Sequence, residues 1–291
     1  MPYLPIPSFT DNEVLIDIEK FVDKVIERKY SRKRFYDDLV ELTFRFNSVF
    51  DWDVCYSPFV DSFKNIIVEY DVYSNDRIYL LNELKRKSIE EWSEYFSSFV
   101  SFQRNMSVQH RYNERLNRYR LFSRLDLLIS KYSTILVVRV DFGYKYKVSL
   151  NQVISDFERF KKKLTYTEYG REKLLFVWAL EQGESKGFHY HIAILFDGSS
   201  RYGAYKIASD LGMFWKEVTQ GNGIYFNCHG KSYLAEFERT GKTGIGMIYS
   251  NFQPQVDNMK DTLGYLAQPD KGQHLRVKTS PKMRTFGMSQ L

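Results

Sequence analysis

The spacing of apolar residues changes near residue 130. Before this point, apolar residues recur every three or four positions; after it, they alternate with polar residues or form short continuous runs. The first pattern is typical of amphipathic helices and the second of strands. We therefore predict an all-helical region over residues 1–130 and a sheet-containing domain over residues 131–291. Two segments, Thr10-Asp-Asn-Glu13 and Ser88-Ile-Glu-Glu91, have the spacing of a capping box, which marks the start of a helix.

In the second region, the pattern predicts strands and helices that follow one another along the chain. Strands are predicted over 134–142, 174–181, 189–197, 224–227 and 246–249, and helices over 150–164, 203–218 and 255–267. The order strand, helix, strand, strand, helix, strand is the split βαβ arrangement of RRM and ferredoxin-like domains. The predicted fold class is therefore α+β, with an antiparallel sheet that helices cover on one face and leave open on the other.

Two histidines lie one residue apart at the start of a predicted strand. Because strand side chains alternate between faces, His189 and His191 project to one side and Tyr190 to the other. Glu181 ends the preceding strand, so a hairpin would bring its carboxylate close to the imidazoles. Two imidazoles and a carboxylate can hold a divalent ion with open coordination positions. The histidines of an isolated His-x-His segment more often pack in the core or face solvent than bind a metal ion. The nearby Glu181 is the feature that favours a metal site here.

A tyrosine near the end of the chain is a candidate nucleophile. Successive residues of a helix are rotated by ~100°, and this rotation places Tyr265 outside the apolar stripe of the helix predicted over 255–267. A phenol with the usual pKa of ~10 attacks a phosphate poorly unless the phosphate charge is neutralised and its own proton is accepted. A metal ion and a lysine, Lys271 or Lys260, could supply this help. With twenty-two tyrosines in the chain, a structural role is the commoner one for any single tyrosine.

Composition favours an anionic partner. The net charge is +6 and the pI is near 9.0. Aromatic residues make up 17% of the chain, and they serve either to stack on bases or to pack helices together. Five arginines between residues 111 and 124 either bind phosphates or form a solvated helix face.

Cys55 and Cys228 lie too far apart for a cysteine-based zinc motif. Without a signal-like segment or a membrane-length apolar run, a cytoplasmic protein is expected.

Several segments together resemble a known family. His189-Tyr190-His191 resembles the HUH motif of HUH endonucleases, and Glu181 matches the acidic third ligand of replication initiators in that superfamily. Gly264-Tyr265-Leu-Ala-Gln268 resembles their YxxK motif. With Trp178-Ala-Leu-Glu181 and Arg284-Thr-Phe-Gly-Met-Ser289, the chain from about residue 130 resembles the inovirus Gp2 or YagK/YfjJ group of phage and prophage replication proteins.

This resemblance implies a mechanism and partners. Glu181, His189 and His191 would hold Mg²⁺ or Mn²⁺, and Tyr265 would cleave single-stranded DNA to form a 5′-phosphotyrosine. The implied role is rolling-circle replication of a phage, plasmid or satellite, with origin duplex DNA and host replication proteins as partners. Gln268 stands where the motif has lysine. Either Lys271 replaces that lysine, or another tyrosine is the nucleophile.

Four alternatives remain open from the sequence. Tyr249 is the other tyrosine considered as a nucleophile. The enzyme could nick a competitor's DNA without priming replication. The same ligands could hold iron in an oxygenase, which would need a cavity for an organic substrate. A non-catalytic module could instead stack bases of a single strand on an RRM-like open sheet face.

Overall fold

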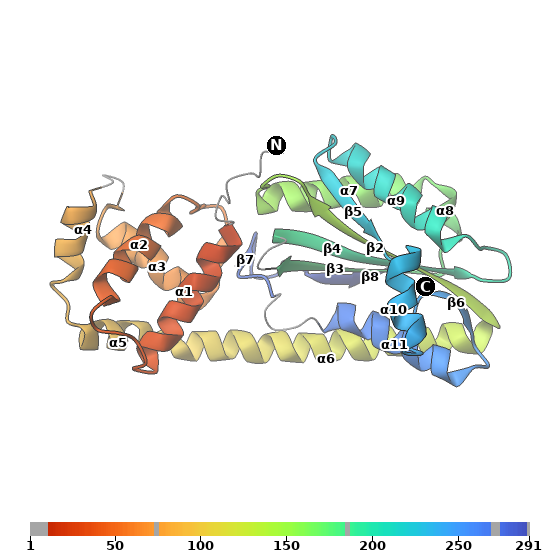
Figure 1. Ribbon diagram of the computed structural model, residues 1–291, viewed down its shortest axis with the longest axis horizontal. Coiled ribbons are helices and arrows are strands. Elements are labelled where there is room, and N and C mark those ends of the chain that lie inside the picture. The colour runs from red at the N-terminus through yellow and green to blue at the C-terminus, as the bar shows by residue number, and fades with distance from the viewer. Residues whose placement is uncertain (1–10, 73–75, 184–186, 269–273, 290–291) are drawn as a thin grey trace. The chain divides into compact units, whose positions relative to one another are not determined.

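The computed structural model describes residues 11–72, 76–183, 187–268 and 274–289 (Figure 1). The chain forms two compact units. Unit 1 comprises Met1–His110 and Leu275–Met283, and unit 2 comprises Arg111–His274 and Arg284–Leu291. The boundary predicted near residue 130 falls in the last turn of helix α6 (Val100–Lys131), a single helix of 32 residues. The division of the chain into an N-terminal domain of residues 1–130 and a second domain of residues 131–291 stays a prediction.

Unit 1 is built mainly from helices. They are α1 (Asp11–Ile26), α2 (Phe35–Asn47), α3 (Pro58–Glu69), α4 (Arg77–Leu84), α5 (Ile89–Ser97) and the first part of α6. The capping box at Ser88 and Glu91 is confirmed, since each side chain accepts a backbone N–H of the other residue. The proposed box at Thr10 lies outside the described residues. Aromatic side chains fill the core, for example the stacked rings of Phe63 and Phe96.

The prediction that residues 1–130 are all-helical is wrong in one short segment. Strand β1 (Cys55–Tyr56) pairs antiparallel with β7 (Val277–Lys278). Its partner lies more than two hundred residues further along the chain, so no local periodicity could reveal the pairing. A two-residue strand also has too few positions to show alternation.

Unit 2 contains a six-stranded antiparallel sheet, which confirms the predicted α+β class. Its strands are β2 (Thr134–Tyr144), β3 (Leu175–Gly183), β4 (Gly187–Asp197), β5 (Gly223–Asn227), β6 (Gly246–Tyr249) and β8 (Phe286–Met288). The strand order is β5-β2-β4-β3-β8. On the side of β2 that faces away from β4, two short strands pair with it: β6 with its first residues and β5 with its last.

Helices α7 (Leu150–Thr165) and α9 (Ala204–Val218) cover one face of this sheet (Figure 1). Aromatic rings make the contact. Tyr190 of β4 stacks on Phe157 of α7 with a centroid distance of 4.0 Å, and Phe142 of β2 stacks on Trp215 of α9 at 4.9 Å. Short helix α8 (Glu168–Glu172) leads into β3. The prediction that Tyr190 points away from the histidines is confirmed, because its ring lies among these helices.

The expectation that the other face is open is wrong. The last turns of α6 and helix α11 (Gln253–Ala267) pack against that face through Leu121, Leu125, Leu128, Met259 and Leu263. The strand residues beneath them, such as Val137, Val177 and Leu195, are fully buried. The periodicity of α6 and α11 predicted helices correctly, but it did not show which surface their apolar stripes cover.

Helix α10 (Lys231–Arg239), between β5 and β6, was not predicted. None of its nine residues is buried, and Tyr233 and Leu234 pack only partly against the core. Nine residues are also fewer than the window of about 11–18 residues in which helical periodicity is read from a sequence. Across the described residues, no helix has both the length and the apolar character that crossing a membrane requires.

Candidate metal centre

The register of three strands assembles the centre. Glu181 of β3 pairs directly with His189 of β4, and His191 of β4 pairs with Asp141 of β2. Directly paired residues project from the same face of a sheet, so all four side chains share the face that α6 and α11 cover. Gly187, at the start of β4, has a φ of 62°, in the left-handed region that glycine enters readily. The register of the three strands therefore positions the four side chains.

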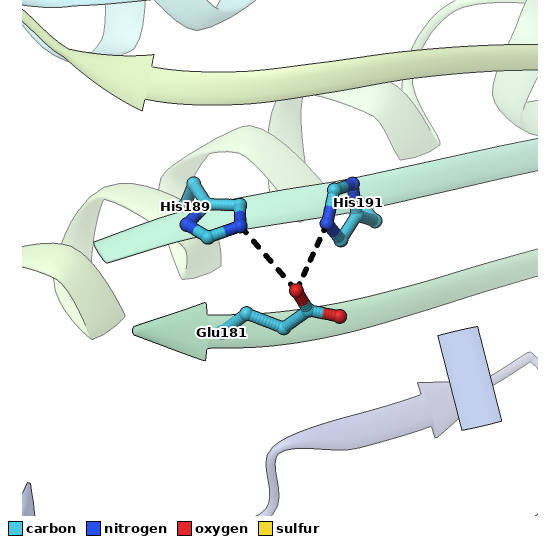
Figure 2. Close-up of side chains that lie close together, drawn as sticks. All are labelled: Glu181, His189 and His191. Atoms are coloured by element: carbon cyan, nitrogen blue, oxygen red, sulfur yellow. Dashed lines mark hydrogen bonds and ion pairs between the residues drawn. The ribbon is translucent and has the colours of Figure 1, made fainter. Parts of the chain in front are cut away.

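Glu181, His189 and His191 converge on one point (Figure 2). Oε2 of Glu181 lies 3.1 Å from Nε2 of His191 and 3.4 Å from Nε2 of His189. The exposed fraction is 0% for Glu181 and 7% for each histidine. The three residues do cluster as expected, but the expectation that they lie on an exposed sheet face is wrong, because neighbouring helices bury the cluster.

The three side chains fit a divalent cation. Their donor atoms all lie within 4.8 Å of one another. Two donors on adjacent corners of an octahedron, each about 2.1 Å from an ion, are about 3 Å apart, close to the spacing of Oε2 and each Nε2 here. Within the described part of the chain, the buried Oε1 of Glu181 has no hydrogen-bond partner. A buried carboxylate oxygen left without a partner is costly, and a cation would satisfy it.

A second carboxylate sets the orientation of His191. Its Nδ1–H donates to Oδ1 of Asp141 at 2.8 Å, which directs Nε2 toward Glu181. This is the arrangement in which an outer carboxylate fixes the tautomer of a metal-binding histidine. Asp141 also accepts from Nε of Arg139 at 3.4 Å.

The charges of the cluster depend on one another. Burial alone would raise the pKa of Glu181, but the two imidazoles lower it to about 2. Burial would lower the pKa of His191, but its hydrogen bonds to Asp141 and Glu181 raise it to about 9. The ring of His191 lies between Asp141 at Nδ1 and Glu181 at Nε2, and without a metal ion it therefore carries a proton on each nitrogen, the Nε2 proton facing Glu181. That proton occupies the position that suits a cation.

Sequence reasoning did not assign roles to Arg139, Asp141 and His229. The backbone N–H of Arg139 donates to Nε2 of His229 at 2.9 Å, and burial lowers the pKa of that histidine to about 4, so it is neutral. Arg139 and Asp141 interrupt an otherwise apolar strand at alternate positions, on the same face as Val137. That alternation was the available signal: two charged residues on one face of a buried strand require partners there.

The structure brings Tyr265 to the cluster of Glu181, His189 and His191. Its ring lies edge-on to that of His191, with the centroids 6.2 Å apart and the planes at 73°. Tyr265 lies on α11 beside Leu263 and Leu266, which are buried against the sheet, while its own side chain is half-buried. Two segments separated by more than seventy residues thus meet at one place.

The alternative residues lie elsewhere or outside the described chain. Tyr249 pairs with Thr134, seven residues along β2 from Asp141, which at the usual rise of a strand is about 23 Å away. Lys260 forms an ion pair with Asp126 of α6 at 2.5 Å. Lys271 lies outside the described residues. Gln268 follows the last turn of α11 and is exposed.

The chain matches the family model of the YagK/YfjJ C-terminal domain over residues 99–289. This match spans more than half of the chain, and the protein belongs to that family. It starts at the beginning of α6 and so includes the whole sheet and the metal centre. No curated protein and no solved structure matches the chain.

Proposed function

We propose that this protein is a metal-dependent endonuclease that nicks and rejoins single-stranded DNA, with Tyr265 as its nucleophile. The observation that carries the proposal is the position of the Tyr265 ring, 6.2 Å from that of His191 and beside a buried Glu/His/His cluster. A metal site beside a tyrosine suits transfer of a phosphoryl group to a phenol. The net charge of +6 suits a polyanionic substrate.

The topology supports an HUH-type core. In unit 2, β2, α7, β3, β4, α9 and β5 follow one another as in the split βαβ arrangement, and their strands lie in the order β5-β2-β4-β3. The His-Tyr-His segment lies on the central strand β4, with its third ligand on the neighbouring strand β3. These are the positions that the resemblance to HUH endonucleases leads us to expect.

The reaction is an exchange of phosphodiester bonds. The Tyr265 oxygen forms a bond to phosphorus, the bond from phosphorus to the 3′ oxygen breaks, and the phenol proton is balanced by the proton that the leaving 3′ oxygen takes up. The products are a 5′-phosphotyrosine and a free 3′-hydroxyl, and the reverse reaction rejoins the strand. An Mg²⁺ or Mn²⁺ ion held by Glu181, His189 and His191 would supply Lewis acidity toward the phosphate.

The chain's own residues prepare the site for this reaction. Asp141 holds His191 in one orientation, and the apolar contacts of α6 and α11 limit the access of water to the cluster. In such surroundings, fixed charges act more strongly on a developing negative charge than they do in water. Tyr265 is held on a helix whose neighbouring residues are buried, so its ring position is set by the core.

Biologically, the proposed role is initiation of rolling-circle replication in a phage, plasmid or satellite, with single-stranded and origin duplex DNA and host replication proteins as partners. A nickase that cuts competing DNA would share the same chemistry, and an origin next to the gene would distinguish the two. The non-catalytic RRM-like alternative loses its main support, because helices cover both faces of the sheet. Turnover with a 2-oxo acid after loading with iron would favour the oxygenase alternative.

The test is formation of a covalent protein–DNA adduct. Single-stranded DNA from the region around the gene is incubated with the protein and Mn²⁺ and analysed by denaturing electrophoresis. We expect an adduct with the wild-type protein and with Tyr249→Phe, but none with Tyr265→Phe or with folded His189→Ala. An adduct that survives Tyr265→Phe and disappears in Tyr249→Phe would assign the nucleophile to Tyr249.

A further inference from the structure

A pocket of about 150 Å³ lies beside Tyr265 in unit 2. Its walls come from α10, from α11 and from the segment between α10 and β6, and they include Tyr233, Phe237, Thr243 and Thr262. A cavity of about 150 Å³ accommodates a benzene molecule, that is, one six-membered ring. The metal centre does not account for this pocket.

Two aromatic rings, those of Tyr233 and Phe237, line the pocket. The centroids of Tyr233 and Phe237 are 4.9 Å apart, and the exposed ring of Phe226 lies edge-on to Tyr233 at 5.2 Å. Both pocket rings belong to α10, in which no residue is buried. These rings are therefore partly accessible, and flat aromatic surfaces of this kind stack on nucleobases.

Two threonines, Thr243 and Thr262, also line the pocket. Among the residues that the structure describes, none forms a hydrogen bond with the buried Oγ1 of Thr243. Because a buried hydroxyl without a partner is costly, this one is suited to a polar group on a ligand. The backbone next to it packs closely on α11, since a Cβ on Gly244 would come within 2.2 Å of the carbonyl oxygen of Asn258. The Asn258 side chain also donates to the carbonyl of Gly241 at 2.7 Å.

Two residues connect the pocket to the metal centre. Tyr265 lines the pocket and also contacts the ring of His191. Arg139 lines it as well, and its Nη2 lies 3.3 Å from Nδ1 of His191. A group in the pocket is therefore next to the tyrosine that attacks the scissile phosphate, as a neighbouring nucleotide of the same strand would be.

We propose that this pocket binds one pyrimidine base of the single strand that Tyr265 cleaves. The base stacks on Tyr233 and Phe237, and a polar edge of the ring bonds to the hydroxyl of Thr243. This inference rests on the proposed function, because it identifies which part of the DNA the site recognises next to the cleaved bond. It gives the enzyme a means to select the nucleotide at that position.

Binding without cleavage tests the pocket separately. Fluorescein-labelled dT20, dC20 and dA20 are titrated with the full-length protein in EDTA, and the dissociation constant is measured by anisotropy. We expect dT20 or dC20 to bind more tightly than dA20, and Tyr233→Ala and Phe237→Ala each to weaken pyrimidine binding about fivefold or more, fivefold being the lower end of the effect of losing one stacked base. Thr243→Val, which keeps the shape of the side chain, should reduce the preference among bases. The control is Tyr146→Ala, an exposed tyrosine of unit 2 outside the pocket, which should bind as the wild type does.

Photo-crosslinking of the wild-type protein provides a test that does not depend on a variant folding. A dT20 strand that carries 5-iodouracil is irradiated with the protein, and the tryptic peptides are identified by mass spectrometry. We expect crosslinks in the peptide of residues 232–239, which contains both aromatic residues. Crosslinks confined to other peptides, with unchanged dT20 binding in Phe237→Ala, would overturn the proposal. A preference for dA20 that requires Phe237 would overturn the assignment to pyrimidines.

The outcomes separate this inference from the proposed function. A crosslink at residues 232–239 without any covalent adduct would support the pocket and contradict the nuclease. An adduct that depends on Tyr265, together with no effect of any pocket variant on binding, would support the nuclease and contradict the pocket.

Discussion

Nδ1 of His191 lies 2.8 Å from Oδ1 of Asp141 on the neighbouring strand. The two residues are directly paired in the sheet, so their contact follows from the strand register. A carboxylate at Nδ1 leaves Nε2 as the atom that can bind a metal ion, and it makes that nitrogen a better donor. Asp141 thus orients His191 within the cluster that could hold a metal ion.

Substitution of Asp141 should weaken metal binding. In Asp141→Asn the amide no longer carries the charge that holds the Nδ1–H, so we expect Mn²⁺ affinity, measured by calorimetry, to fall about ten- to one-hundredfold. Asp257→Asn is the matched control, because Asp257 is exposed on α11 and accepts a hydrogen bond from Gln253, four residues before it on the same helix. Equal Mn²⁺ affinity in Asp141→Asn and the wild type would show that Asp141 does not support the site.

Metal affinity should depend on pH. The pKa of His191 is raised to about 9 in the metal-free protein, so below this pH a cation must displace the proton at Nε2. We expect the affinity for Mn²⁺ to rise about tenfold per pH unit between pH 6.5 and 8 and to level off above pH 9. Calorimetry in buffers of different ionisation enthalpy would measure the released proton. An affinity that is constant over this range would contradict the assignment of that proton.

The same pKa shift predicts how metal-free stability depends on pH. A folded-state pKa above the unfolded value means that the charged His191 stabilises the fold fully below pH 6.5, and that this stabilisation is lost as the pH rises through about 9. We expect the melting temperature in EDTA to fall over this interval, and to fall less in His191→Gln. The comparison between the two proteins isolates the contribution of His191.

A bound cation should stabilise the folded protein. Mn²⁺ at one hundred times its dissociation constant should add about 2.7 kcal/mol to the free energy of unfolding. Glu181→Gln should reduce this gain strongly, because it removes the charged ligand whose Oε1 has no partner among the described residues. Thermal denaturation with and without Mn²⁺ measures the effect. If the melting temperature of Glu181→Gln rises with Mn²⁺ as much as that of the wild type, the cluster is not the binding site.

Tyr190 should matter for stability rather than for metal binding. Its ring is 2% exposed and stacks on Phe157 on the sheet face opposite the histidines. We expect Tyr190→Ala to reduce the free energy of unfolding by about 3–5 kcal/mol, the usual cost of truncating a large buried aromatic side chain. Urea denaturation checks this, with the exposed Tyr205→Ala as a control that should change little. A loss of Mn²⁺ affinity in a Tyr190→Ala protein that is still folded would contradict this division of roles.

The sequence by itself determined the local features of this protein. Alternation along β4 was enough to place His189 and His191 on one face and Tyr190 on the other, and the pattern of apolar residues was enough to predict the α+β class and most helices and strands of unit 2. Glu181 could be added because it lies close to the end of the strand that precedes the histidines, two residues before Gly183. All these features depend on neighbours within a few residues or within one hairpin.

Only the tertiary structure decided what surrounds the metal centre. It placed α6 and α11 over the sheet face that was expected to be open, and it brought Tyr265 rather than Tyr249 to His191. It also paired β1 with β7 and joined Asp141 to His191. The physical reason is that periodicity shows that a helix has an apolar face but not which surface buries it. That choice depends on packing between segments far apart in the chain, and here it converts an exposed pair of histidines into a buried, charge-coupled site.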